Sequence, residues 1–232
     1  VRAAKFLGPA CDIEPKACNI VGELYRKGEG VAKDGQKAAD FHRRACESKL
    51  IVSCAIEAQL RYRGEDGAQV DKARARIAYE KSCGPDFYDS CANAGVMFAN
   101  GEGGPVDKTR ARVFYEKACV GGEQMGCVNQ AALLLAGEGG PADPAKGRAL
   151  LETACEQKNS FACFNLGVIF AKGQDVPQDF DRALVLIDKA CVAGNQEGCK
   201  FATQLRDDLA KQKAAAAQAA TKGKPAAAKK AK

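Results

Sequence analysis

The twelve cysteines of this 232-residue chain recur in pairs at a fixed interval. The two members of a pair are eight positions apart, except in the first pair, where they are seven apart. From Cys46 onward, one pair follows the next every 36 or 37 residues. The pairs are Cys11 and Cys18, Cys46 and Cys54, Cys83 and Cys91, Cys119 and Cys127, Cys155 and Cys163, and Cys191 and Cys199. A fixed period of this length is typical of a solenoid built from repeated units.

Two further columns of residues share this period. A glycine stands ten positions after the second cysteine of a pair, namely Gly28, Gly64, Gly101, Gly137 and Gly173. An aspartate follows it, namely Asp34, Asp71, Asp107, Asp143 and Asp179. Glycine readily adopts the left-handed conformation that ends a helix. An aspartate side chain caps the start of one, because it accepts a free backbone N–H. Each unit is therefore predicted to contain two helices joined by a short loop.

The second helix of each unit carries apolar residues at helical spacing, as in Ala38, Phe41, His42 and Ala45 of the first unit. The first helix offers a small residue to this face, and these residues are Gly22, Ala58, Gly95, Ala131 and Gly167. They predict a close approach of the two helices. Other units have Tyr, Leu or Ile at the position of His42, so we expect His42 to be a packed core residue with its hydrogen bonds satisfied.

The period divides the chain into five repeats, 18–53, 54–90, 91–126, 127–162 and 163–198. Residues 1–17 resemble the second helix and turn of a further repeat. Either this half-repeat acts as a cap or an upstream part is missing, and we favour the second interpretation, in which a secretory signal could precede the chain. Residues 199–220 are predicted to form a capping helix.

Residues 221–232 are rich in Lys and Ala and are predicted to be disordered. The segment 211–232 contains seven lysines and no acid, so the remaining body has 28 basic and 29 acidic residues. Such a tail is either attracted to anionic polymers or membrane surfaces, or is solvated without a fixed partner. No stretch of the chain approaches 18 consecutive apolar residues, so we expect no membrane-spanning helix.

An alanine also precedes the first cysteine of most pairs, namely Ala45, Ala118, Ala154 and Ala190, with Ser82 in the remaining repeat. Together with the glycine and aspartate columns, this column resembles Sel-1-like repeats, a helix-pair family related to tetratricopeptide repeats. The cysteine pair in every unit resembles the Hcp-like subgroup of secreted, cysteine-rich bacterial proteins, and is also similar to a mitochondrial factor for respiratory-chain assembly. The resemblance implies an all-α, right-handed α/α superhelix, found in the periplasm or outside the cell. The mitochondrial intermembrane space is the alternative.

Three interpretations of the cysteines are open: disulfides, zinc ligands or buried thiols. We favour a disulfide within each pair, because the two cysteines end one helix and start the next, antiparallel one. Zinc sites are disfavoured because C-x-x-C is absent and His42 is the single histidine. Buried thiols would have drifted to Ala or Val in some units, yet all six pairs are complete. Disulfides imply an oxidising compartment.

The resemblance also implies penicillin binding and β-lactam hydrolysis, which the residues support poorly. None of the five serines is followed by Lys at the third position, so Ser-x-x-Lys is absent. A metal route requires several histidines. We therefore assign no catalytic residue, metal or cofactor, and keep a β-lactamase-like hydrolase and a respiratory assembly factor as alternative functions.

One polar column fits neither core nor loop. Asn93, Asn129 and Asn165 stand two positions after a cysteine and face away from the second helix. Lys27 and Arg63 are expected on the same face. An Asn side chain matches the donors and acceptors of a peptide group. We therefore predict that a monomeric scaffold or adaptor holds a protein or extended peptide segment in a concave groove. The alternative is that these Asn bond loop carbonyls between repeats.

Overall fold

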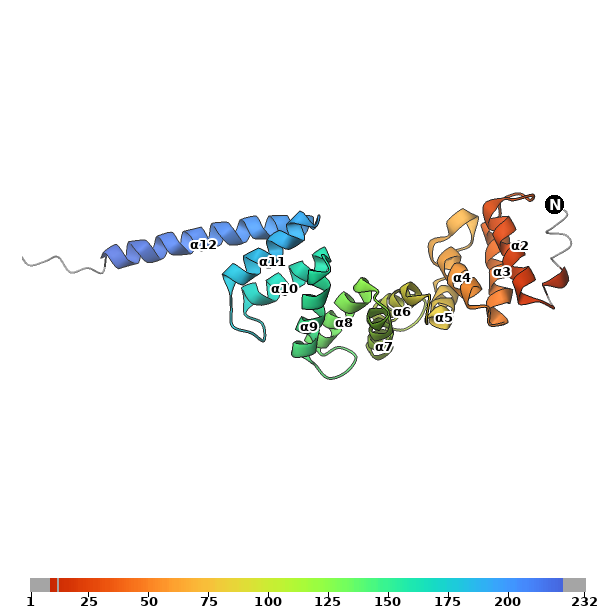
Figure 1. Ribbon diagram of the computed structural model, residues 1–232, viewed down its shortest axis with the longest axis horizontal. Coiled ribbons are helices and arrows are strands. Elements are labelled where there is room, and N and C mark those ends of the chain that lie inside the picture. Colours follow the sequence, from red (N-terminus) through yellow and green to blue (C-terminus); the bar gives the residue numbers. More distant parts are fainter. Residues whose placement is uncertain (1–8, 12, 223–232) are drawn as a thin grey trace, which may run out of the picture. The chain divides into compact units, whose positions relative to one another are not determined.

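The computed structural model describes residues 9–11 and 13–222, with side chains as far as residue 215, and this part of the chain is all-α. The predicted fold class is confirmed. The α-helices, which Figure 1 labels, are α2 (Pro15–Lys27), α3 (Gly35–Glu47), α4 (Ile51–Arg63), α5 (Lys72–Ser82), α6 (Tyr88–Asn100), α7 (Lys108–Val120), α8 (Gln124–Ala136), α9 (Pro144–Glu156), α10 (Ser160–Lys172), α11 (Phe180–Val192) and α12 (Gln196–Lys222). One 3-10 turn, η1 (Glu65–Gly67), follows α4.

The helices belong to two compact units, residues 1–150 and 151–232, and α9 crosses the boundary. In the first unit, α2 packs on α3, α4 on α5 and α6 on α7. Each pair also packs on the next, through α3 with α4, α5 with α6 and α7 with α8. In the second unit, α10 packs on α11 and α11 on α12. Packing between sequence neighbours is the pattern of a helical-repeat solenoid.

The predicted helix ends are present in all five repeats. The recurring glycines cap the first helices with φ between 65° and 75°. The recurring aspartates cap the second helices, and in each case the carboxylate accepts a backbone N–H three residues on, at 2.9 Å. The two columns therefore fix where the chain turns in each repeat.

His42 is buried as predicted, and the small-residue column explains how it fits. A Cβ placed on Gly22 would lie 2.7 Å from the imidazole Nε2, so only glycine leaves room for the ring. The expectation of satisfied hydrogen bonds was wrong. Neither ring nitrogen has a hydrogen-bond partner among the described residues, and the nearest carboxylate, that of Glu23, lies 3.6 Å from Nε2. Burial lowers the pKa of His42 to about 4, so the ring is neutral.

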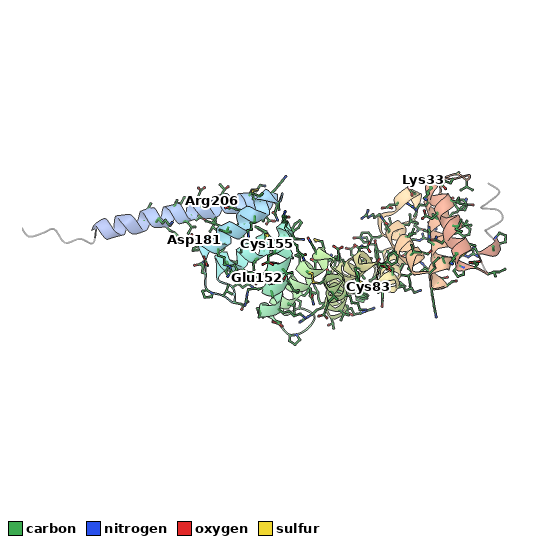
Figure 2. The ribbon with its side chains drawn as sticks, in the orientation of Figure 1. Lys33, Cys83, Glu152, Cys155, Asp181 and Arg206 are labelled. Atoms are coloured by element: carbon green, nitrogen blue, oxygen red, sulfur yellow. A yellow bond between two sulfur atoms is a disulfide. The ribbon has the colours of Figure 1, made fainter. Side chains whose placement is uncertain are left out.

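Ion pairs between successive second helices form a further repeating feature. A basic residue in the first turn of one helix contacts a glutamate of the preceding one, in the pairs Arg74–Glu47, Arg110–Glu80, Lys146–Glu116 and Arg182–Glu152. Figure 2 labels Glu152, and also Arg206 of α12, which pairs with Asp188 of α11. These contacts are exposed, so each contributes little to stability on its own.

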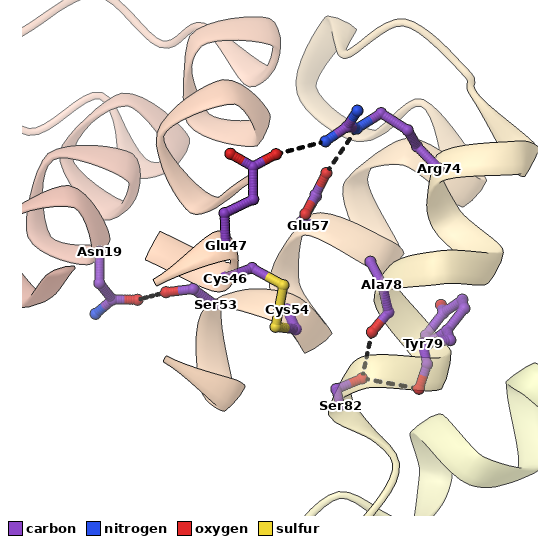
Figure 3. Close-up of a disulfide and its surroundings, with 10 residues drawn as sticks. All are labelled: Asn19, Cys46, Glu47, Ser53, Cys54, Glu57, Arg74, Ala78, Tyr79 and Ser82. Carbon is purple, nitrogen blue, oxygen red and sulfur yellow. Dashed lines mark hydrogen bonds and ion pairs between the residues drawn. A yellow bond between two sulfur atoms is a disulfide. The ribbon is translucent and has the colours of Figure 1, made fainter. Parts of the chain in front are cut away.

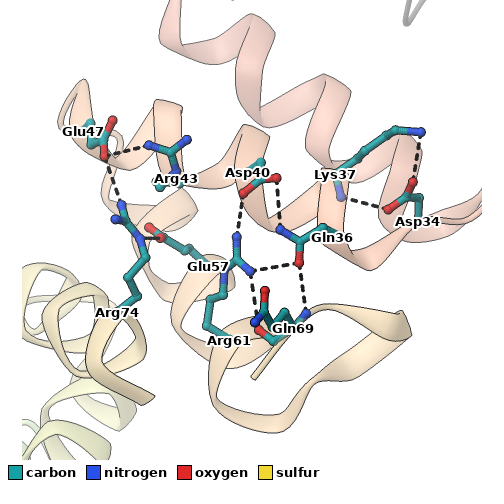
Figure 4. Close-up of polar contacts among 10 residues, drawn as sticks. All are labelled: Asp34, Gln36, Lys37, Asp40, Arg43, Glu47, Glu57, Arg61, Gln69 and Arg74. Atoms are coloured by element: carbon teal, nitrogen blue, oxygen red, sulfur yellow. Dashed lines mark hydrogen bonds and ion pairs between the residues drawn. The ribbon is translucent and has the colours of Figure 1, made fainter. Parts of the chain in front are cut away.

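A denser polar cluster joins the first two repeats (Figure 4). The buried Arg61 guanidinium donates to Asp40 at 2.6 Å and to the side chain of Gln36 at 3.0 Å. Beside it, Arg74 contacts Glu57, whose pKa is raised by burial. The cluster ties α3, α4 and α5 together.

Each predicted cysteine pair is a disulfide in the structure. The Cα atoms of the paired residues are 4.4–4.6 Å apart, including those of Cys11 and Cys18. Figure 3 shows how the bond between Cys46 and Cys54 links the end of α3 to the start of α4. From Cys46 onward, the covalent links therefore join the second helix of one repeat to the first helix of the next.

The two ends of the chain are described only in part. Residues 1–8 and 12 of the predicted partial repeat, and residues 223–232 of the predicted tail, lie outside the described residues. The predicted capping helix 199–220 is part of α12, which begins earlier, at Gln196, and ends at Lys222. No helix in the described part of the chain is long and apolar enough to cross a membrane.

Candidate functional site

The predicted binding residues all lie on the first helices of repeats. In the first unit, Asn93 is exposed on α6 and Asn129 is half-buried on α8, while Lys27 and Arg63 end α2 and α4. Asn165 is half-buried on α10 of the second unit. Each of these side chains is thus available at the surface of its own unit.

The three Asn side chains make no hydrogen bond to any other described residue. Other asparagines of the chain do: Asn19 accepts from Ser53, Asn159 caps α10 and Asn195 caps α12. The alternative in which Asn93, Asn129 and Asn165 bond loop carbonyls has no support in these contacts. Their donors and acceptors are free for a ligand.

The two basic residues of the predicted surface are already in ion pairs. Lys27 lies 3.5 Å from Glu23, and Arg63 lies 3.3 Å from Glu65. Both pairs are exposed, so they contribute at most about 1 kcal/mol each. The charge that these cations would offer to an acidic ligand is partly neutralised.

Arg63 and Asn93 line one pocket of about 270 Å³ between α4 and α6 of the first unit. Val52, Ala55 and Ile56 of α4 provide an apolar wall, and Tyr79 of α5 and Phe87, before α6, add two aromatic side chains. The polar groups are Gln59, Arg63, Asp89, Ser90 and Asn93. The pocket therefore combines an apolar wall with several hydrogen-bonding groups.

Ser90 is the most unusual of these residues. Only 1 % of it is exposed, and its hydroxyl has no hydrogen-bond partner among the described residues. Ser53, at the same position of the preceding repeat, donates to the Asn19 side chain at 2.9 Å (Figure 3). Ala55 stands where a counterpart of Asn19 would face Ser90. A buried hydroxyl without a partner costs free energy, so its presence in a pocket wall points to a ligand.

Tyr79, which also lines this pocket, keeps its proton. Burial raises the pKa of its phenol to about 12. Its ring contacts Tyr62 edge to face, with 6.2 Å between ring centroids. The phenol is thus a neutral, fixed part of the wall.

The sequence interpretation missed Ser90, Tyr79, Phe87 and Gln59 as site residues. For Ser90 the sequence does contain a signal, in the residues on either side of the second cysteine of a pair. Ser53 and Ser90 precede this cysteine in successive repeats. The residue that follows the corresponding cysteine one repeat earlier is Asn19 in the first case and Ala55 in the second. Comparing the columns would have shown that a hydroxyl loses its partner.

Helix pairs in sequence order, with a disulfide at each junction, define a disulfide-linked helical-repeat protein. The Sel1 repeat family model matches residues 15–50, 89–122, 125–159 and 160–195, which together make up more than half of the chain. The chain therefore belongs to the Sel1 repeat family. The helix pair between the first two matches, which contributes α4 to the pocket, lies outside them. A comparison with curated proteins gives no significant match.

Solved structures of similar fold come from several bacteria. One is c5321 of uropathogenic Escherichia coli, described as a protective antigen with an SLR fold, which is 27% identical with a TM-score of 0.72. The match covers 85% of this chain but 42% of that one, so this chain spans less than half its length. A Sel1 repeat protein from Oxalobacter formigenes is 23% identical over 84% of this chain and 77% of that one, with a TM-score of 0.68.

Cysteine rich protein B of Helicobacter pylori also matches. It is 21% identical over 73% of this chain and 95% of that one, with a TM-score of 0.30. The six disulfides of this chain are the pairs that the spacing of its cysteines predicts. Disulfides of this number suggest an oxidising compartment.

Proposed function

We propose that the protein is a binding scaffold that holds an extended segment of another protein against the first helices of its repeats. The observation that supports this most is the free hydrogen-bonding capacity of Asn93 and Asn129, on the first helices of successive repeats in the first unit. An Asn side chain can donate to and accept from the same peptide unit. Binding through such groups depends on the peptide backbone more than on its side chains.

The oxidising compartment that we propose is the bacterial periplasm or the exterior of the cell, with the mitochondrial intermembrane space as the alternative. Each of these compartments is oxidising, so the disulfides of the solenoid persist there. Such a scaffold presents a rigid surface to segments of partner proteins, because its helices are cross-linked at every junction.

Fluorescence anisotropy with capped 12-residue peptides tests the proposal. A pool of labelled random peptides is titrated with the full chain, and the tightest binder is then compared with two derivatives. Scrambling its sequence should weaken binding only slightly, whereas methylating alternate backbone nitrogens should weaken it at least tenfold, because each methyl group removes a donor.

The opposite pattern would overturn the proposal. If scrambling abolishes binding and backbone methylation does not, recognition depends on side chains alone. If no peptide of the pool binds at millimolar concentration, the first-helix surface is not a peptide site. A compartment-specific pull-down, followed by the same titration with the captured segment, would then identify the natural partner.

A further inference from the structure

The pocket between α4 and α6 offers more than backbone recognition. Its lining combines apolar residues, among them Val52 and Ile56, and two aromatic residues with several hydrogen-bonding groups. With a volume of about 270 Å³ it has room for one large side chain of a bound segment. Asn93 stands in its wall, so a backbone bonded to Asn93 would carry its side chains directly over the pocket.

The unpaired Ser90 hydroxyl sets a first requirement on that side chain. It is buried, lines the pocket, and lacks the Asn partner that Ser53 has one repeat earlier. A purely apolar occupant would leave the hydroxyl without a partner and would displace any water that satisfies it, so such an occupant is disfavoured. The occupant should therefore carry a hydrogen-bonding group at its far end.

Charge sets a second requirement. The lining residues include one cation, Arg63, and one anion, Asp89. The Arg63 guanidinium is also 3.3 Å from Glu65, whose carboxylate accepts from Gln59 at 3.4 Å. A carboxylate in the pocket would meet Asp89 and compete with Glu65, and an ammonium group would meet Arg63. The surroundings thus favour a neutral occupant.

The aromatic residues set a third requirement. Tyr79 and Phe87 both line the pocket, and aromatic rings prefer edge-to-face or offset contacts with another ring. A neutral aromatic side chain with a terminal hydroxyl meets all three requirements, because its phenol both donates and accepts.

We propose that this pocket is the anchor site for a tyrosine side chain of the bound segment, with the phenol hydrogen-bonded to Ser90. The proposal rests on the function proposed above, because it assumes that a peptide lies along the first helices. It adds a side-chain preference to recognition that would otherwise read only the backbone.

The side-chain analogue p-cresol tests the pocket without any peptide backbone. The full chain, labelled with ¹⁵N, is titrated with p-cresol, toluene, acetate and butylammonium at millimolar concentrations. The resonances of Ser90 and Asn93 should shift saturably with p-cresol, and p-cresol should bind about three- to tenfold more tightly than toluene. The two ions should not saturate these shifts.

Two serine variants locate the effect. Ser90→Ala should bring p-cresol down to the affinity of toluene, whereas Ser53→Ala removes the matching hydroxyl of the preceding repeat and should leave both affinities unchanged. An undiminished preference for p-cresol in Ser90→Ala would overturn the assignment. So would a lack of saturable shifts at Ser90, or tighter binding of acetate or butylammonium than of p-cresol at this place.

A peptide arm separates this proposal from the one on which it rests. The capped peptide Gly-Gly-Tyr-Gly-Gly should bind more tightly than p-cresol and more tightly than its Ala counterpart. If p-cresol binds through Ser90 and the Tyr peptide binds no more tightly than p-cresol, the pocket is supported and the proposal of backbone binding is rejected. If the Tyr and Ala peptides bind equally well, backbone binding stands and the tyrosine site is rejected.

Discussion

Two serines at equivalent positions have opposite hydrogen-bonding states. The Ser53 hydroxyl donates to Asn19, whereas the buried Ser90 hydroxyl has no partner among the residues that the structure describes. Removing one member of a made hydrogen bond costs about 1 kcal/mol, while removing an unpaired buried hydroxyl relieves a penalty. Ser53→Ala should thus lower the free energy of unfolding by about 1 kcal/mol, and Ser90→Ala should leave it unchanged or raise it. Chemical denaturation of both variants at pH 7 checks the pair, and an equal loss in both would contradict it.

His42 should make stability depend on pH. Its folded-state pKa is about 4, below the ordinary 6.5, because burial disfavours the charged ring. The unfolded chain therefore binds a proton that the folded chain does not between these values, so stability is lost as pH falls through this window. Linkage puts the loss at about 2 kcal/mol between pH 7 and pH 5. Glu23, which partly opposes the shift, and Arg26 are the charged neighbours on α2.

The matched variant for this effect is His42→Leu, since Leu151 occupies the same position in a later repeat. Urea unfolding of the wild type and of His42→Leu at pH 7 and pH 5 gives the loss of unfolding free energy in each protein. The difference between the two losses is the contribution of the imidazole ring. If the variant loses as much stability as the wild type over this interval, other groups are responsible.

At the scale of single helices, the recurring aspartates fix where the second helices begin. Asp107 accepts the backbone N–H of Arg110 at 2.9 Å, so Asp107→Ala should cost about 1 kcal/mol of unfolding free energy. Asp107→Asn keeps an accepting oxygen and should cost much less. Thermal unfolding of the two variants distinguishes a cap from a mere surface charge, because a charge effect would make Asn as damaging as Ala.

Much of the fold was predictable because it depends on short, repeated signals. A glycine that ends a helix, an aspartate that begins one and a cysteine near each end are local requirements, and each recurs with the period. His42 shows the limit of predicting structure from such local signals. Its burial follows from the pattern of its column, but whether its ring nitrogens find partners depends on Glu23 of another helix.

The pocket was less predictable than the helices. Asn93 and Arg63 were expected on one face, but their shared pocket depends on the packing of α4 against α5 and α6. Within the described part of the chain the Ser90 hydroxyl has no partner, because Ala55 stands where the preceding repeat has Asn19. A search for residues that repeat does not detect such a departure. Sites of this kind arise where the period is broken.

At the scale of the whole chain, six disulfides each link two cysteines that are seven or eight positions apart. In the chain-entropy model, each closed loop of about eight residues stabilises the fold by roughly 2.5 kcal/mol. Peptide mapping without reductant should recover only local pairs, with Cys46 linked to Cys54. A single digest that links Cys46 to any other cysteine would contradict the scheme.

The most direct test of the binding account uses one variant and two readouts. Asn129 is half-buried on α8 and makes no hydrogen bond to any other described residue, so Asn129→Ala should leave the melting temperature unchanged. It should weaken the tightest binder of the random-peptide pool several-fold, because one amide–peptide hydrogen bond contributes about 0.5–1.5 kcal/mol. Asn159→Ala is the control: it removes the cap of α10, so it should lower the melting temperature and leave affinity unchanged. A melting temperature lowered by several degrees in Asn129→Ala, with unchanged peptide affinity, would show that this Asn serves the fold and contradict the account.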